Sequence, residues 1–277
     1  MYKIEDKVTL APAIKKIKVR APMIAKKTKP GNFIILRVNE KGERIPLTIA
    51  DYDNKSGLVT IIFQEVGFTT RELGSLEKGD YIQDIVGPLG NPIEIEDYDK
   101  VVCIGGGSGT ALLYPKVKAF YKEGSEVISI TGARTKELII LENELEKYSD
   151  DLYICTDDGS YGHHGFVTDI LKDLLAEDNI DLVVAIGPVP MMSAVADLTE
   201  SQDIETIVSL NSLMIDGTGM CGGCRVTVGG ETKFTCVDGP AFNGHKVDFE
   251  ELNNRLSYYN QEESCHLEEE VKTNAEE

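Results

Sequence analysis

VVCIGGGSGT, residues 101–110, is the stretch of sequence that decides the fold. Four apolar residues, typical of a buried strand, lead into a glycine-rich turn and then into residues that favour a helix. Such a turn lets a pyrophosphate approach the backbone and meet the positive end of the helix. Because Thr110 stands where G-x-G-x-x-G has its third glycine, the match is incomplete and weak by itself. We predict nucleotide contacts from Gly105, Gly106, Gly107, Ser108, Gly109 and Thr110.

Strands and helices alternate from this stretch onward. Apolar strands are expected over 101–104, 127–130, 152–156 and 182–186, and helices over 110–123, 136–147, 168–176 and 190–199. This alternation predicts a doubly wound α/β domain over residues 99–210, with a parallel sheet covered on both faces. Two more turns follow strand ends at the edge where such sheets bind ligands. They add Asp157, Asp158, Gly159, Gly187 and Pro188 to the predicted nucleotide contacts.

Residues 1–98 have a different pattern. Short runs that favour strands, such as 14–19, 33–38 and 58–65, are separated by turn signals such as Pro30-Gly31 and Lys78-Gly79. Regularly spaced strands without helical periodicity predict a small antiparallel β-barrel. The breakers in Gly87-Pro-Leu-Gly-Asn-Pro92 place the boundary between the two domains near residue 98.

Residues 211–245 are rich in glycine and cysteine and too irregular for an apolar core of their own. Asp216, Cys221, Cys224 and Cys236 have the spacing D-x4-C-x2-C-x11-C, which is the plant-type ferredoxin spacing with a carboxylate in the first place. Iron accepts oxygen as well as thiolate ligands. The segment therefore predicts a [2Fe-2S] domain with these four metal ligands.

Two other interpretations of the cysteines stay open. Cys-x2-Cys is also a zinc knuckle, and His245 would complete a Cys3His site in a zinc-stabilised nucleotide-binding adaptor without redox function. A dithiol pair at Cys221 and Cys224 is the second alternative.

Charge and hydropathy argue against a nucleic-acid partner, a signal peptide and a membrane span. The net charge is −19, and all of the acidic excess follows residue 98, which disfavours nucleic acid. The charged start leaves no room for a signal peptide, and no apolar run is long enough to cross a membrane, so we expect a cytoplasmic protein.

Residues 246–277 are expected to form a C-terminal helix, which begins at Asp248, and an acidic tail. The helix carries an apolar stripe of Phe249, Leu252, Leu256 and Tyr259. The stripe would pack either on its own domain or on a partner subunit.

These motifs together resemble the ferredoxin reductase superfamily. Within it, the chain is similar to the iron–sulfur flavoproteins related to the electron-transfer subunit of dihydroorotate dehydrogenase, and most of all to the small (alpha) subunits of NADH-dependent reduced-ferredoxin:NADP oxidoreductases. The resemblance covers nearly the whole chain, and its most specific motif is Asp216-Gly-Thr-Gly-Met-Cys-Gly-Gly-Cys224. The first cluster ligand is Cys in the dihydroorotate subunits and Asp in the closer family, as here.

The resemblance implies a function and a set of further contacts. FAD would bind the barrel, NAD(H) would bind the α/β domain, and electrons would pass between NAD(H), FAD and the [2Fe-2S] cluster without a general acid–base pair. The implied FAD contacts are Pro46, Leu47 and Thr48, Phe63, Gln64 and Glu65, and a phosphate loop with Gly67, Thr69 and Thr70. Arg134 after the second strand would favour a 2′-phosphate, whereas Asp157 and Asp158 would oppose one.

The resemblance also implies a partner. This would be a larger flavin and [4Fe-4S] subunit that forms a heterodimer with the chain and links it indirectly to ferredoxin. The alternative within the superfamily is the electron-transfer subunit of dihydroorotate dehydrogenase, which Asp216 disfavours.

Overall fold

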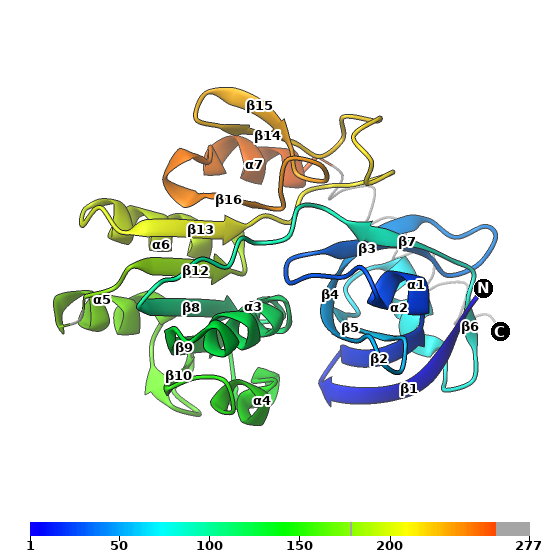
Figure 1. Ribbon diagram of the computed structural model, residues 1–277, viewed down its shortest axis with the longest axis horizontal. Coiled ribbons are helices and arrows are strands. Elements are labelled where there is room, and N and C mark those ends of the chain that lie inside the picture. The colour runs from blue at the N-terminus through cyan, green and yellow to red at the C-terminus, as the bar shows by residue number, and fades with distance from the viewer. Residues whose placement is uncertain (178, 259–277) are drawn as a thin grey trace.

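The computed structural model describes residues 1–177 and 179–258. Figure 1 shows a barrel lobe on the right, a lobe of sheet and helices on the left, and a small third part above them. Within the described ranges, no helix is both long enough and apolar enough to cross a membrane.

The barrel lobe is a seven-stranded antiparallel sheet with the order β6-β1-β2-β5-β4-β3-β7, as the sequence predicted. On β3, Ile34 and Leu36 point into the barrel core, whereas Phe33 and Ile35 belong to a separate apolar cluster. The strands are β1 (Tyr2–Ala11), β2 (Ile14–Arg20), β3 (Phe33–Arg37), β4 (Arg44–Asp53), β5 (Leu58–Gln64), β6 (Tyr81–Ile82) and β7 (Asp84–Leu89), and the helices are α1 (Pro22–Ala25) and α2 (Phe68–Ser75).

The second lobe is the predicted α/β domain, with the strand order β11-β10-β9-β8-β12-β13-β16. All neighbours in this sheet are parallel except β13 and β16. Its strands are β8 (Lys100–Gly106), β9 (Glu126–Ala133), β10 (Asp151–Thr156), β11 (His163–His164), β12 (Leu182–Ile186), β13 (Glu205–Ser209) and β16 (Ala241–Asn243). Its helices are α3 (Gly109–Glu123), the 3-10 helix η1 (Lys136–Leu138), α4 (Glu142–Glu146), α5 (Val167–Glu177) and α6 (Val189–Glu200).

The two lobes meet through α3. Ala111 of α3 shares a buried apolar cluster with Ala50 and Ile62 of the barrel. Beside this cluster, Lys118 Nζ lies 2.9 Å from Asp51 Oδ1 on β4. The interface is therefore a packed core with an ion pair at its side, which fixes the orientation of the barrel relative to the parallel sheet.

The third part contains the hairpin β14 (Arg225–Val228) and β15 (Glu231–Phe234), the 3-10 helix η2 (Gly244–Lys246) and α7 (Phe249–Leu256). The side chain of Asp248 caps α7 by accepting a hydrogen bond from Glu251 N at 2.8 Å, as the sequence predicted. Leu252 is 1% exposed and packs in the core of the α/β lobe, with Phe249 beside it. Phe249 and Leu252 of the apolar stripe thus pack on the same chain, whereas Leu256 is 37% exposed. Tyr259 and the acidic tail lie outside the described residues.

Two expectations about this lobe differ from the structure. The helix expected over 136–147 is two short helices, because Ile140 and Leu141 leave the helical path to pack on the barrel, with Leu141 at φ 60°. Residues 241–243, which we assigned to the cluster domain, form β16 at the edge of the α/β sheet. A three-residue edge strand is too short for its periodicity to show in sequence.

Candidate functional site

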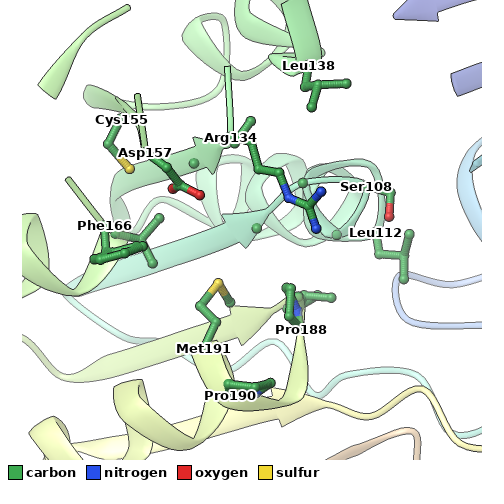
Figure 2. Close-up of a pocket in the computed structure, with 18 of the residues that line it drawn as sticks. Ser108, Leu112, Arg134, Leu138, Cys155, Asp157, Phe166, Pro188, Pro190 and Met191 are labelled. Carbon is green, nitrogen blue, oxygen red and sulfur yellow. The ribbon is translucent and has the colours of Figure 1, made fainter. Parts of the chain in front are cut away.

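A cavity of about 770 Å³ opens at the carboxyl ends of the parallel strands, where the strand order reverses between β8 and β12. Ligands of open α/β sheets bind at such a switch point. Figure 2 shows the turns that follow the strands converging on it. The predicted nucleotide contacts that line it are Gly106, Gly107, Ser108, Gly109, Asp157, Gly187 and Pro188, and Gln64 reaches it from the barrel.

Two glycines in the first turn have separate steric roles. Gly107 has a φ of +55°, a backbone conformation that other residues rarely adopt. Gly109 lies so close to β12 that a Cβ there would be 2.4 Å from the carbonyl oxygen of Ile186. The start of α3 therefore approaches the neighbouring strand closely, which is what a pyrophosphate site at a helix N-terminus requires.

The cavity has a charged end formed by Arg134 and Asp157, which follow the neighbouring strands β9 and β10. The two turns are tied by a hydrogen bond from Asp157 N to Ala133 O at 3.0 Å. In Figure 2 the guanidinium of Arg134 points into the cavity. A guanidinium in this place suits a phosphate, since it can donate two parallel hydrogen bonds to its oxygens.

Four of the predicted nucleotide contacts, Gly105, Thr110, Asp158 and Gly159, do not line the cavity. Thr110 is buried, and its Oγ1 lies 2.8 Å from Thr131 Oγ1, which ties α3 to β9. Asp158 accepts hydrogen bonds from Ser160 N at 2.9 Å and Ser160 Oγ at 2.6 Å, and the hydroxyl bond is the main cause of its lowered pKa. These residues shape the turns that carry the cavity wall.

Other cavity residues were not among the predicted contacts. Ser209 is the last residue of β13 and Asn211 follows the strand, so the rule that ligands bind at strand ends would have found them. Cys155 also lines the cavity, and burial raises the pKa of its thiol to about 11, which keeps it protonated. The remaining lining residues are Ile14, Leu112, Gly132, Ala133, Leu138, Phe166, Val167, Thr168, Ile186, Pro190, Met191 and Ala194.

The residues expected to contact FAD lie on β4, β5 and the start of α2. Thr48 and Pro46 pair across the strands with Phe33 and Ile35 of β3, so all four side chains share one face of the sheet. Leu47 instead packs against the barrel core, and Phe63 is 3% exposed within it. The structure thus leaves Pro46 and Thr48, with Gln64, as the strand residues available to a flavin.

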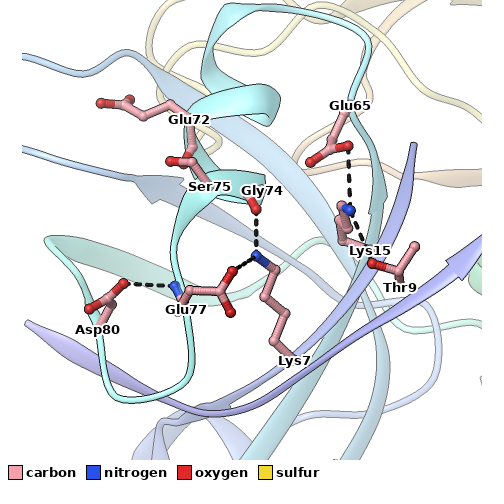
Figure 3. Close-up of polar contacts among 9 residues, drawn as sticks. All are labelled: Lys7, Thr9, Lys15, Glu65, Glu72, Gly74, Ser75, Glu77 and Asp80. Carbon is pink, nitrogen blue, oxygen red and sulfur yellow. Dashed lines mark hydrogen bonds and ion pairs between the residues drawn. The ribbon is translucent and has the colours of Figure 1, made fainter. Parts of the chain in front are cut away.

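Glu65 has a local partner, as Figure 3 shows. Its carboxylate lies 3.8 Å from Lys15 Nζ and against Gly74 of α2, where a Cβ would be 1.8 Å from Oε1. Lys7 contacts the same C-terminal end of α2, where it donates to Gly74 O at 2.7 Å and to Glu77 Oε1 at 2.8 Å. Glu65 therefore positions α2 against β2.

The expected phosphate loop forms the N-terminus of α2. Thr70 Oγ1 accepts hydrogen bonds from Val66 N and Gly67 N, each at 3.0 Å, which closes the turn. Thr69 is 5% exposed, and its Oγ1 lies 3.4 Å from Glu43 Oε2. A helix start of this kind presents N–H groups to an anion.

Of the four predicted cluster ligands, Asp216, Cys221 and Cys224 lie on one loop, and Cys236 lies in the turn after β15. Cys224 Sγ and Cys236 Sγ are 3.2 Å apart, both residues are buried, and Cys221 is exposed. Asp216 holds the loop by accepting from Thr218 N at 2.6 Å and Cys221 N at 2.7 Å. Glycines at positive φ, among them Gly217, Gly219 and Gly222, let the chain wrap this tightly.

The electrostatics of the loop connect the same four side chains. Burial raises the pKa of the Cys236 thiol to about 12, and hydrogen bonding to Cys224 and the charge of Asp216 add to the increase. The pKa of Asp216 is lowered, mainly by the hydrogen bond from Thr218 N and further by Cys221. In the described part of the chain, no three His, Cys, Asp or Glu side chains are already spaced as ligands of a single metal ion. Three thiols and a carboxylate around a glycine-rich loop nevertheless fit a [2Fe-2S] cluster. Its two irons bind different ligands, so the four side chains do not have to meet at one point.

The structure does not support the zinc alternative. His245 Nε2 lies 3.0 Å from Thr199 Oγ1 on α6, and Thr199 in turn accepts from Thr206 Oγ1. This network places His245 against the α/β lobe. The five described cysteines are also free thiols, which gives no support to a disulfide between Cys221 and Cys224.

The cluster loop packs directly on the barrel. Cys224 and Cys236 share a buried cluster with Phe33 and Ile35 of β3, together with Met214. Since Phe33 and Ile35 pair with Thr48 and Pro46, the wall under the cysteines continues into the strand expected to face FAD. One strand pair therefore links the two candidate redox sites.

Comparison with known proteins identifies relatives of the cysteine-rich segment and of the whole chain. The sequence model of the iron-sulfur cluster binding domain of dihydroorotate dehydrogenase B matches residues 211–248. The chain is 45% identical to a Thermotoga maritima homologue of the dihydroorotate dehydrogenase B electron transfer subunit, over 99% of this chain and 96% of the relative. It is 33% identical to that subunit of Fusobacterium nucleatum, over 89% of this chain and 97% of the relative.

Solved structures extend the likeness to three dimensions. A structure of an NADH-dependent reduced ferredoxin-NADP oxidoreductase, described for flavin-based electron bifurcation, superposes with a TM-score of 0.93 at 44% identity and covers 98% of each chain. An Amycolatopsis cytochrome P450 reductase shares the fold at 19% identity, with a TM-score of 0.62 over 73% of this chain and 65% of that one.

Proposed function

This chain belongs to the family of the dihydroorotate dehydrogenase B electron-transfer subunits and their homologues, and we propose that it is an electron-transfer subunit in ferredoxin:NAD(P) oxidoreduction. It exchanges electrons between NAD(H), FAD and a [2Fe-2S] cluster. This places it with the solved NADH-dependent reduced ferredoxin-NADP oxidoreductase, to which it is similar over almost its entire length.

One observation carries the proposal. The cluster cysteines pack on Phe33 and Ile35, which pair with Pro46 and Thr48 on β4. The nucleotide cavity reaches the same barrel through Gln64. The barrel thus touches both other sites, as a flavin that exchanges electrons with both must do.

The residues of this chain bind and position, and the cofactors supply the redox chemistry. A nicotinamide delivers or accepts a hydride, a flavin couples two-electron to one-electron steps, and a cluster carries one electron. Gly107 and the N-terminus of α3 would hold the pyrophosphate, and Arg134 would donate hydrogen bonds to one of its phosphate groups. The cluster would be held by Asp216, Cys221, Cys224 and Cys236. The proposal assigns NAD(H) to the cavity, because Asp157 beside Arg134 opposes an additional 2′-phosphate.

The proposed partner is a larger subunit that carries flavin and [4Fe-4S] centres and communicates with ferredoxin. The support is that the solved relative is a ferredoxin-NADP oxidoreductase and that curated relatives are electron transfer subunits. Electrons leave or enter through the cluster loop, on which Met220 is 89% and Ile215 57% exposed.

Anaerobic purification of the full chain tests the proposal. We expect a brown protein with one FAD and two irons per chain, bleached by NADH and less effectively by NADPH. Cys224→Ser is the matched variant, and it should lose the cluster absorbance. A colourless chain that holds zinc, or a flavin that NADH does not reduce, would contradict the proposal.

A further inference from the structure

The Cys221-Gly-Gly-Cys224 turn is held from outside by side chains that are not cluster ligands. Arg225 Nη1 donates to Gly222 O at 3.3 Å, and Arg255 Nη2 donates to Gly223 O at 3.0 Å. Thr235 donates to Cys224 O through both its N–H and its Oγ1, each at 3.0 Å. Three successive carbonyls of the turn are therefore fixed.

Fixing a carbonyl also fixes the next amide, because C=O and N–H point in opposite directions across a trans peptide. The Gly222 carbonyl faces Arg225, and the following Gly223 N–H points back to Cys221 Sγ at 3.4 Å. The hold of Arg255 on the Gly223 carbonyl orients the Cys224 N–H in the same way, away from the guanidinium.

We propose that Arg255 is a positioning residue for the cluster: from α7, it fixes the Gly223–Cys224 peptide so that amide N–H groups face the cluster sulfurs, and it places a positive charge behind the turn. The inference rests on the proposed [2Fe-2S] function. Through Arg255, α7 would influence the reduction potential of the cluster although α7 supplies no cluster ligand.

The position of Arg255 is itself determined by the α/β lobe. Leu252, one turn earlier on α7, is 1% exposed in the core of that lobe. Glu251 Oε2 accepts a hydrogen bond from Thr227 N at 3.0 Å, and Asp248 N donates to Thr227 O at 2.9 Å. The helix is therefore anchored to β14 and to the core, and Arg255 extends from this support to the turn.

The expected consequence is on the reduction potential. The reduced cluster carries one more negative charge, so N–H groups and a nearby guanidinium stabilise it more than the oxidised form. Loss of Arg255 should lower the potential. If Arg255 only stabilised the fold, its loss would change the stability of the chain but leave the potential and the EPR spectrum of the assembled cluster unchanged.

The test uses the full chain as Arg255→Gln, Arg255→Lys and, as a matched control, Lys233→Gln. Lys233 is a cation of the neighbouring strand β15, paired with Glu231 and without a contact to the turn. EPR-monitored redox titration should give a lower potential and shifted g-values for Arg255→Gln, and a smaller change for Arg255→Lys, which keeps the charge. Lys233→Gln should stay close to the unsubstituted chain.

Wild-type potential and spectrum in both Arg255 variants would overturn the inference, as would an equal fall in Lys233→Gln. If Arg255→Gln does not retain iron, Arg255→Lys decides the question by the same readout. An unsubstituted chain without a [2Fe-2S] EPR signal would instead refute the proposed function, so the two failures are distinguishable.

Discussion

Replacing Gly217 with alanine tests whether the cluster loop and the barrel form one structural unit. Gly217 follows the predicted ligand Asp216 and has a φ of +72°. A Cβ at this position would lie 2.8 Å from Ile35 Cγ1 and 2.9 Å from Leu89 Cδ1, both on the barrel. The loop therefore lies against β3 and β7 with no room for a methyl group.

The expected cost has two parts. The left-handed backbone costs an L-residue about 1–2 kcal/mol. An extra methyl group in a packed apolar contact costs about 1–3 kcal/mol. Together they predict a loss of about 2–5 kcal/mol in the free energy of unfolding for Gly217→Ala.

Gly230→Ala is the matched control for the backbone part. Gly230 has a φ of +79° in the β14–β15 turn, and no atom lies within 4 Å of the Cβ it would gain. Urea unfolding should show a loss of only about 1–2 kcal/mol for this variant. Iron and FAD per chain should both fall in Gly217→Ala and stay normal in Gly230→Ala.

Equal stability losses in the two variants, to within about 0.5 kcal/mol, would refute the reasoning. A double-mutant cycle strengthens the test. Ile35→Ala removes the atoms nearest to the new methyl group, so Gly217→Ala should cost less in that background than in the unsubstituted chain.

Three further predictions concern other parts of the chain. Burial lowers the pKa of Lys116 to about 8, so Lys116→Met should stabilise the protein by about 3 kcal/mol at pH 7. The gain should shrink between pH 8 and 10.5, where the unfolded chain binds the proton that the folded chain lacks; an equal gain in denaturant titrations at pH 7 and 10 would contradict this. Asp216→Ala should change cluster occupancy and the EPR signal, whereas Asp216→Cys should keep a cluster of altered potential; an unchanged Asp216→Ala signal would exclude Asp216 as a ligand. Arg134→Gln should weaken nucleotide binding by about 1.5–3 kcal/mol in calorimetry, and unaltered affinity would remove Arg134 from the site.

Much of the fold could be predicted because its signals are local. The apolar strands 101–104 and 182–186 contain the cores of β8 and β12, and Asp248 begins α7 as its capping pattern indicates. The missed features depend on tertiary contacts. Leu141 leaves the expected helix to pack on the barrel, and β16 exists only because β13 offers a free edge.

For the candidate site, the sequence signals are also local. The spacing of Cys221, Cys224 and Cys236 predicts a cluster site, because the residues of a metal-binding loop lie close together in sequence. In the structure, Cys224 Sγ and Cys236 Sγ are 3.2 Å apart. The contribution of β3 could not be predicted. Phe33 and Ile35 read as ordinary barrel residues in sequence, and only the packed structure shows them under Cys224 and Cys236.

This packing changes the expectation for loss of the cluster. The barrel and the cysteine-rich segment are separate in sequence, which suggests that a flavin site would survive without iron. In the structure they share a buried core, and β3 and β4 are hydrogen-bonded neighbours, about 4.8 Å apart in any sheet. A disturbance of Cys236 is therefore transmitted to Thr48 through a single strand. Close-packed cores pass on such displacements instead of absorbing them, so flavin occupancy should depend on the integrity of the cluster loop.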